Sequence, residues 1–308
     1  MVFQVIIPIF FLLALGYASV KVNLLSQDQV KAVGAFVLKI ALPALLFQSL
    51  ATKDLNEIWL PEFFIVYTLV TIVLFAVAYL LVSRYFDNAP THVPILALGA
   101  SMSNTGLLGT AVLTLLMGQK AMTYVSLVVI MESVLLIPAV LIMAELGSKS
   151  DLNIVKVIQE TFKTLLTSPL TLSVFFGIAC SMFNVHLPML IENSLAILGQ
   201  SASSLALFTI GGGIVGMTLK HVNAQTFYLV FSNNFLMPLL VFTGLYYFTQ
   251  ASREVIFAAT IIASLPMPTI FGMLGQAYGA GDKTMTPLLM STIAGFAVAS
   301  VVIAILGQ

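Results

Sequence analysis

The chain is dominated by apolar runs of about 20 residues, the length that a helix needs to cross roughly 30 Å of hydrocarbon. Of its 308 residues, 60% are hydrophobic and only 8% are charged, whereas soluble domains contain about 25% charged residues. A soluble globule is therefore excluded, and we expect an all-α polytopic membrane protein surrounded by membrane lipid. Twelve basic residues balance twelve acidic ones, so the chain lacks the basic surface that binds nucleic acid.

Ten apolar segments qualify as transmembrane helices. They lie near residues 2–20, 31–50, 62–83, 93–117, 122–146, 169–185, 190–217, 225–249, 254–278 and 284–307. With ten spans, eight of the basic loop residues fall on one side, and only Lys53, Lys120 and Arg253 fall on the other. Because loop lysine and arginine mark the cytoplasmic side, we expect both termini to be extracytoplasmic, with the chain in the plasma membrane, which is the inner membrane of a bacterium.

Two segments depart from a plain apolar span. The seventh is the least apolar and contains the triple glycine Gly211-Gly212-Gly213, so we expect it to pack closely against protein rather than face lipid throughout. The longest polar stretch, 147–168, keeps apolar residues such as Ile154, Val155 and Ile158 at helical spacing. This pattern predicts a cytoplasmic connecting loop with a short amphipathic helix.

The second half of the sequence repeats the first at an offset of 161 to 163 residues. For example, Gly16 and Asn23 match Gly177 and Asn184. The repeat divides the chain into a five-helix unit at 1–146, the loop at 147–168, and a second five-helix unit at 169–308. Because five is odd, the second unit enters the membrane from the opposite side. Inverted repeats of this kind are typical of secondary transporters, whose substrate site lies where broken helices of the two halves meet.

The fourth and ninth spans are interrupted at equivalent repeat positions. The fourth contains Ser103, Asn104 and Thr105 between glycines, and the ninth contains Pro266, Met267 and Pro268. Each proline removes a backbone donor and clashes with a preceding carbonyl. We therefore expect helices 4 and 9 to be broken and to cross, with these six residues at a substrate site. Half-helix N-termini and free carbonyls at such a site suit a small ion or an organic anion.

Other polar groups lie inside predicted spans, where charge is costly. Glu132 is an acid in apolar surroundings, which favour its protonated form, so it is a candidate proton carrier or a bonded structural carboxyl. Lys39 could attract an anion or snorkel to the interface. Asn233 and Asn234 could line a substrate cavity or join helices. We interpret Pro43, Pro138 and Pro238 as ordinary kinks because the repeat gives them no counterparts.

Three segments resemble the auxin efflux carrier family: Ser101–Gly109, Ala263–Pro268, and Pro8 through Gly16-Tyr17. That family includes plant auxin carriers and bacterial malonate and malate permeases. The resemblance implies a scaffold of spans 1, 2, 6 and 7 and a transport domain of spans 3–5 and 8–10 that moves in an elevator-type step. It also implies that Asn104 helps to bind a substrate carboxylate. Met267 stands opposite Asn104 in the second repeat, so a symmetric pair of asparagines is missing.

These patterns predict a permease that moves a small organic anion, a mono- or dicarboxylate, by alternating access at the helix 4 and helix 9 crossover. A sodium-coupled organic-anion symporter and a transporter-like receptor or channel are the alternatives. We expect no enzyme, because zinc-protease and nucleophile–base motifs are missing. We expect no metal and no bound cofactor, while H⁺ or Na⁺ coupling and a homodimer stay open.

Overall fold

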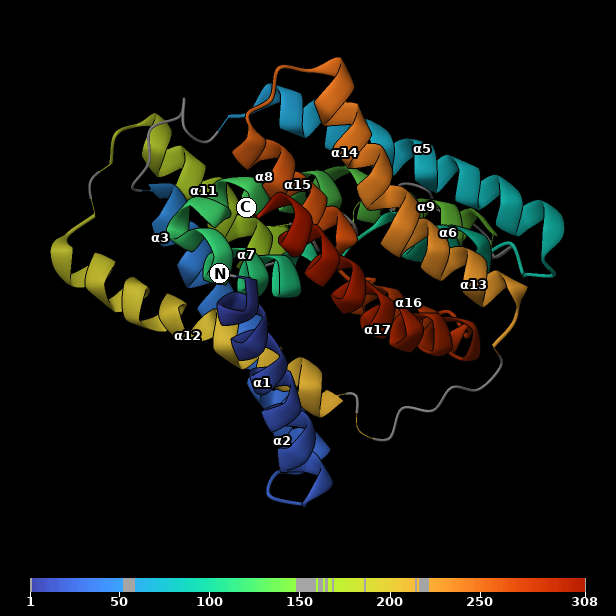
Figure 1. The fold of residues 1–308 in the computed structure, drawn as a ribbon, viewed down its shortest axis with the longest axis horizontal. Helices are drawn as coiled ribbons and strands as arrows, with labels where there is room; N and C mark the ends of the chain where they lie inside the picture. The colour runs from blue at the N-terminus through green and yellow to red at the C-terminus, as the bar shows by residue number, and fades with distance from the viewer. Residues whose placement is uncertain are drawn as a thin grey trace. The chain divides into compact units, whose positions relative to one another are not determined.

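A computed structural model describes residues 2–51, 59–147, 169–185, 187–213 and 222–307, together with positions 159, 163, 166, 167 and 215. Every regular element in these residues is helical (Figure 1), which agrees with the predicted all-α class. The amphipathic helix predicted within 147–168 falls almost wholly outside the described residues, and so does residue 308.

The predicted spans coincide with helical segments to within four residues at each end. Several segments are divided by π-helical or 3₁₀ turns, labelled η. In chain order the elements are α1 (Val2–Lys21), α2 (Gln27–Phe36), η1 (Val37–Ala41), α3 (Leu42–Ala51), α5 (Pro61–Tyr85), α6 (His92–Ser101), η2 (Thr105–Gly109), α7 (Thr110–Met117), η3 (Gly118–Lys120), α8 (Ala121–Met131), η4 (Glu132–Leu136), α9 (Ile137–Gly147), α11 (Pro169–Met182), α12 (Met189–Gly213), α13 (Ala224–Phe231), η5 (Ser232–Leu236), α14 (Met237–Phe248), α15 (Arg253–Ser264), α16 (Thr269–Ala277) and α17 (Gly281–Leu306).

Seven helical segments of the described residues are long and apolar enough to cross a membrane. One of them, His92–Ala144, runs for 53 residues, and two shorter apolar helices lie at Phe10–Lys21 and Thr171–Met182. The span Pro61–Tyr85 is only 28% buried although it is strongly apolar. Such a surface is stable against lipid, so the chain is an integral membrane protein of polytopic helical type.

Three mid-span prolines stand at π-helical turns. Pro43, Pro138 and Pro238 each follow the end of η1, η4 and η5, respectively, by two residues. A proline cannot donate to the carbonyl four residues earlier and clashes with it, and a π turn widens the helix where that carbonyl lies. The ordinary kinks predicted from sequence are therefore local π-helical turns, and these turns carry Lys39, Glu132 and the Asn233–Asn234 pair.

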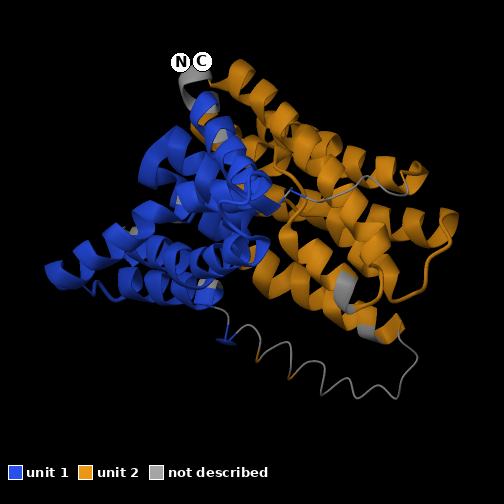
Figure 2. Ribbon diagram, turned by 90° about the horizontal axis from the view of Figure 1, so that it is seen from below, with its two compact units in different colours: residues 1–60, 105–129, 166–217 blue, residues 61–104, 130–165, 218–308 orange. Residues whose placement is uncertain are grey.

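The described helices form two compact units, coloured separately in Figure 2. Unit 1 consists of residues 1–60, 105–129 and 166–217, and unit 2 of residues 61–104, 130–165 and 218–308. Unit 1 thus contains the four spans expected in a scaffold, but also the 105–129 segment that the resemblance assigns to the transport domain. Contacts between α7 and α12 help to explain this grouping.

Matching local geometry supports the sequence repeat, which stays a prediction. Two residues beyond the ends of α1 and α11 lies a left-handed asparagine, Asn23 with φ 59° and Asn184 with φ 50°. The same hydrogen bond closes each turn, from Leu24 N to Ser19 O and from Val185 N to Cys180 O, both 2.9 Å long. These residues are the ones that the repeat aligns. The five-helix units at 1–146 and 169–308 are a separate division from the two compact units.

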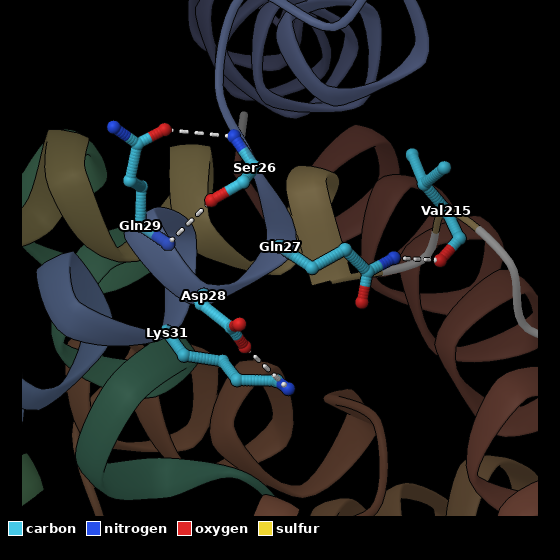
Figure 3. Close-up of polar contacts among 6 residues, drawn as sticks. All are labelled: Ser26, Gln27, Asp28, Gln29, Lys31 and Val215. Carbon is cyan, nitrogen blue, oxygen red and sulfur yellow. Dashed lines mark hydrogen bonds and ion pairs between the residues drawn. The ribbon is translucent and has the colours of Figure 1, made fainter.

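Unit 1 is organised around α12, which packs against α1, α2 and α3. The approach of α1 and α12 requires glycine: a Cβ on Gly211 would lie 1.9 Å from the Leu13 carbonyl oxygen. The close packing predicted for the triple glycine is thus observed at this residue. Nearby, α2 begins with a capping box between Ser26 and Gln29, and the Gln27 amide donates to the Val215 carbonyl (Figure 3).

We predict that Gly211→Ala lowers the melting temperature of the purified protein in detergent. The new methyl group would collide with backbone, which cannot move aside as a side chain can, and overpacking of this kind costs about 1–3 kcal/mol. Gly213→Ala is the matched control, because nothing lies within 4 Å of a Cβ there. Equal melting of both variants and the wild type would contradict this account of the α1–α12 contact.

Candidate functional site at two broken helices

The two predicted helix breaks are present, and both lie in unit 2. Helix α6 ends at Ser101 and is followed by extended backbone, with Met102 at φ −126° and ψ 134°. Helix α15 ends at Ser264 and is followed by Leu265 at φ −67° and ψ 157°. We call residues 102–104 the first break and residues 265–268 the second break. Met102 N and Leu265 N still donate to the Leu98 and Ile262 carbonyls at the ends of α6 and α15, and the extended backbone beyond them lies outside the regular helical hydrogen-bond pattern.

The two breaks are joined directly by hydrogen bonds. The Asn104 N–H donates to the Pro266 carbonyl at 2.8 Å. The Ser103 hydroxyl donates to the Ala263 carbonyl at 3.2 Å. The structure therefore connects the two segments that contain five of the residues predicted at the substrate site, namely Ser103, Asn104, Pro266, Met267 and Pro268.

The π-helical turn η5 supplies side chains to both breaks. The Ser232 hydroxyl donates to the Ala100 carbonyl at 3.0 Å, and the Asn233 amide donates to the Met102 carbonyl at 2.8 Å. The Asn234 amide lies 3.5 Å from the Ser264 carbonyl oxygen. Ser232, Asn233 and Asn234 all have no exposed surface. These contacts join η5 to the two breaks, and both roles predicted for the asparagine pair stay predictions.

A serine from α17 completes this polar network. Met267 has the only backbone N–H between the two prolines of the second break, and it donates to the Ser291 hydroxyl at 2.8 Å. Ser291 in turn donates to Asn233 Oδ1 at 3.2 Å. A buried unpaired amide would cost about 1–3 kcal/mol, so Ser291 stabilises the extended conformation. The sequence contains no signal that singles out this serine among the others.

The edge of the network has two groups suited to an anion. Asn104 keeps 7% exposure, and among the described residues none forms a hydrogen bond with its side-chain amide. Thr269, the first residue of α16, is exposed. The N-terminus of a helix carries unpaired N–H groups and about half a positive charge. Thr269 is a residue that sequence analysis missed, although its place directly after Pro268 marks a helix start.

The remaining predicted residues lie on three other π-helical turns, η2, η4 and η1. Thr105 begins η2, is buried, and belongs to unit 1. Glu132 begins η4 in unit 2, is only 4% exposed, and engages a partner. Its roles as proton carrier and structural carboxyl both stay predictions.

Lys39 lies on η1 in unit 1, halfway along the Gln27–Ala51 helical run. It is exposed and lines an open cavity of ≈ 540 Å³. Apolar side chains of α3, α11 and α12 form most of the wall, together with Ser173 and Cys180. Within the described part of the chain Lys39 has no ion pair, which is compatible with both anion attraction and snorkelling.

Comparison with known proteins identifies one family and several relatives. The family described as "Membrane transport protein" matches residues 1–304. The "Putative malonate transporter" of Rhizobium meliloti is 24% identical over 290 residues, which cover 93% of this chain and 90% of the relative. The "Uncharacterized transporter YfdV" of Escherichia coli is 24% identical over 302 residues, covering 95% and 93%. The mouse "Lysosomal cholesterol signaling protein" is 25% identical over 224 residues, covering 70% of this chain and 26% of that protein.

The family match covers nearly the whole chain, and it includes both broken helices. It agrees with the resemblance found in the sequence of the two breaks and the first helix. The chain therefore belongs to the membrane transport protein family, which is the auxin efflux carrier family.

Proposed function

We propose that this protein is a secondary transporter that carries a small organic anion, a mono- or dicarboxylate, by alternating access at the two breaks. The observation that supports it most directly is the backbone hydrogen bond from Asn104 to Pro266, three residues before the exposed start of α16 at Thr269. The N–H groups at the α16 N-terminus and the Asn104 side chain would bind the substrate carboxylate. The name of the Rhizobium relative is consistent with a dicarboxylate.

The proposal includes ten membrane crossings in two inverted halves. The 53-residue segment His92–Ala144 is long enough for two crossings at 1.5 Å per residue. The two shorter apolar helices fall at the predicted first and sixth spans. In this arrangement the protein lies in the inner membrane with both termini extracytoplasmic, and unit 2 carries the substrate during an elevator-type step. A second copy would bind to the scaffold to form a homodimer.

Counterflow distinguishes a carrier from the receptor or channel alternative. Proteoliposomes loaded with unlabelled dicarboxylate should transiently accumulate radiolabelled dicarboxylate from outside, because a carrier exchanges one substrate for another. A channel dissipates gradients without such an overshoot, and a receptor moves nothing. The family is described as a membrane transport protein family, so enzymatic turnover of the substrate is not part of the proposal.

We predict that Asn104→Ala weakens substrate binding about ten- to hundredfold, which corresponds to losing one hydrogen bond to a charged group, about 1.5–3 kcal/mol. Its melting temperature should stay near the wild-type value, because no described residue depends on the Asn104 side chain. Binding is measured by isothermal titration over a panel of carboxylates. Asn193→Ala, at an exposed position of α12, is the matched control. Unchanged affinity in Asn104→Ala would contradict the proposed role.

We predict that Glu132→Gln abolishes accumulation driven by a proton gradient but preserves substrate exchange. Exchange needs only reorientation of the loaded carrier, whereas accumulation requires a proton to be taken up on one side and released on the other. Glu254→Gln, at an exposed position in the first turn of α15, is the control. If both activities of Glu132→Gln keep their normal pH dependence, Glu132 has a structural role and the coupling lies elsewhere.

The proposed topology predicts the accessibility of single cysteines in a Cys180→Ala background. Cysteines at 150–160 should react with an impermeant maleimide only from the cytoplasmic side, and a cysteine at 308 only from the outside. Intact and inside-out vesicles provide the two orientations. Labelling of both positions from one side would rule out the inverted repeat, because an odd number of crossings must separate them.

A further inference from the structure

The open cavity of ≈ 540 Å³ that Lys39 lines lies entirely within unit 1, between α3, α11 and α12. Its volume falls in the range of about 300–1,000 Å³ that small-molecule pockets occupy. Most of its wall is apolar, and Lys39 is the one charged side chain among the described residues that form it. The polar network at the two breaks belongs to unit 2, so this cavity is a separate feature of the molecule.

The apolar part of the wall follows one face of a helix. Ile40, Pro43 and Phe47 line the cavity, and their spacing of three and four residues places them on the same side of η1 and α3. Phe176 of α11 lines the cavity from a neighbouring helix. From Lys39 to Phe47 the face is about 12 Å long, at 1.5 Å per residue. The cation therefore stands at one end of an apolar row.

Two close helix contacts hold this wall in place. A Cβ on Gly177 of α11 would lie 2.9 Å from Leu50 Cβ, and a Cβ on Gly199 of α12 would lie 3.0 Å from Leu45 Cα. Both helices therefore pack on α3 at glycines, without an intervening side chain. Tight packing of this kind makes the cavity a preformed pocket, which a ligand can enter without first separating the helices.

The described part of the chain gives Lys39 no counter-ion. No described carboxylate lines the cavity, and Asp28 of the same helical run is paired with Lys31 (Figure 3). Lys39 follows that exposed pair by eight residues, which is about 12 Å along a helix. Because this distance exceeds the length of a lysine side chain, snorkelling leaves the ammonium group short of the exposed pair. An unpaired charge inside a membrane is costly, and an anion from outside the chain would offset the cost.

We infer that this cavity binds an amphipathic monoanion, a medium-chain carboxylate, with its carboxylate paired to Lys39 and its alkyl tail along α3 toward Phe47. One cation matches one negative charge, and the ion pair is favourable in a low-dielectric interior. Burial of the tail against the apolar wall supplies further affinity. A dicarboxylate fits poorly, because its second charge would face apolar side chains. The ligand therefore differs from the compact anion proposed for the two breaks.

The chain contains a reporter for this site, because Cys180 is its one cysteine and lines the cavity. The test follows alkylation of Cys180 by a membrane-permeant maleimide, with the purified full chain in phosphatidylcholine nanodiscs. Decanoate, whose tail is about as long as the apolar face, should slow the alkylation. At a concentration about ten times the half-protecting one, the rate should fall roughly tenfold. Decanol, which has the same tail without the charge, should give little protection at equal concentration in the membrane.

Variants of Lys39 test the role of the charge. Lys39→Met keeps an apolar side chain of similar length and removes the ammonium group, so it should raise the half-protecting decanoate concentration about ten- to hundredfold. Lys39→Arg should keep the protection, because it keeps the charge. Lys31→Met is the matched control: it alters a lysine of the same helical run that does not line the cavity, and it should behave like the wild type.

Several outcomes would overturn the inference. Equal protection by decanol and decanoate in the wild type would show that the cavity accepts any alkyl chain, and this comparison decides by itself if Lys39→Met does not fold. An unchanged decanoate response in Lys39→Met would place the carboxylate elsewhere. Ligand-free alkylation that is slower with paired copies in a nanodisc than with single ones would identify a second copy of the chain as the occupant. Because the assay involves no transport, its result is independent of the proposed function.

Discussion

The structure of unit 2 depends on satisfying the backbone where two helices are interrupted inside a membrane. In hydrocarbon there is no water to bond the exposed N–H and C=O groups, so protein must do it. Ser232 and Asn233 bond the first break, and Ser291 bonds the second. These side chains come from two other helices, η5 with its flanks and α17. The breaks are stable only because these helices place polar side chains within hydrogen-bond distance of the interrupted backbone.

The π-helical turns give those polar groups their positions. In η5 the wider turn carries three successive fully buried polar residues, Ser232, Asn233 and Asn234. Pro238 two residues later accounts for the turn, because it removes the donor for the Asn234 carbonyl. The same spacing recurs at η1 with Lys39 and at η4 with Glu132. Pro8 and Pro287, by contrast, lie inside regular α-helices, so a proline alone does not distinguish a π-helical turn from a simple kink.

Much of the fold was predictable because helix length and helix breaks depend on the local sequence, over about 20 residues or fewer. The apolar runs predicted the helices, and Pro266 with Pro268 predicted the interruption of α15 from local chemistry alone. Partnerships across space were not predictable. Ser291 looks like any other serine, and the grouping of residues 105–129 with unit 1 depends on the contact of α7 with α12. The bond from Asn233 to the Met102 carbonyl joins residues 131 positions apart, which no short sequence window encodes.

An interrupted helix differs from a kinked one in the charges that it presents. At the second break, α15 ends at Ser264, whose carbonyl faces the Asn234 amide, and α16 begins at Thr269. Four residues thus separate a negative from a positive helix end. The positive end supports the proposed anion, with no ionised side chain needed there. Because this field comes from aligned backbone dipoles, the hydrogen bonds that hold the break in place also fix the position of the field.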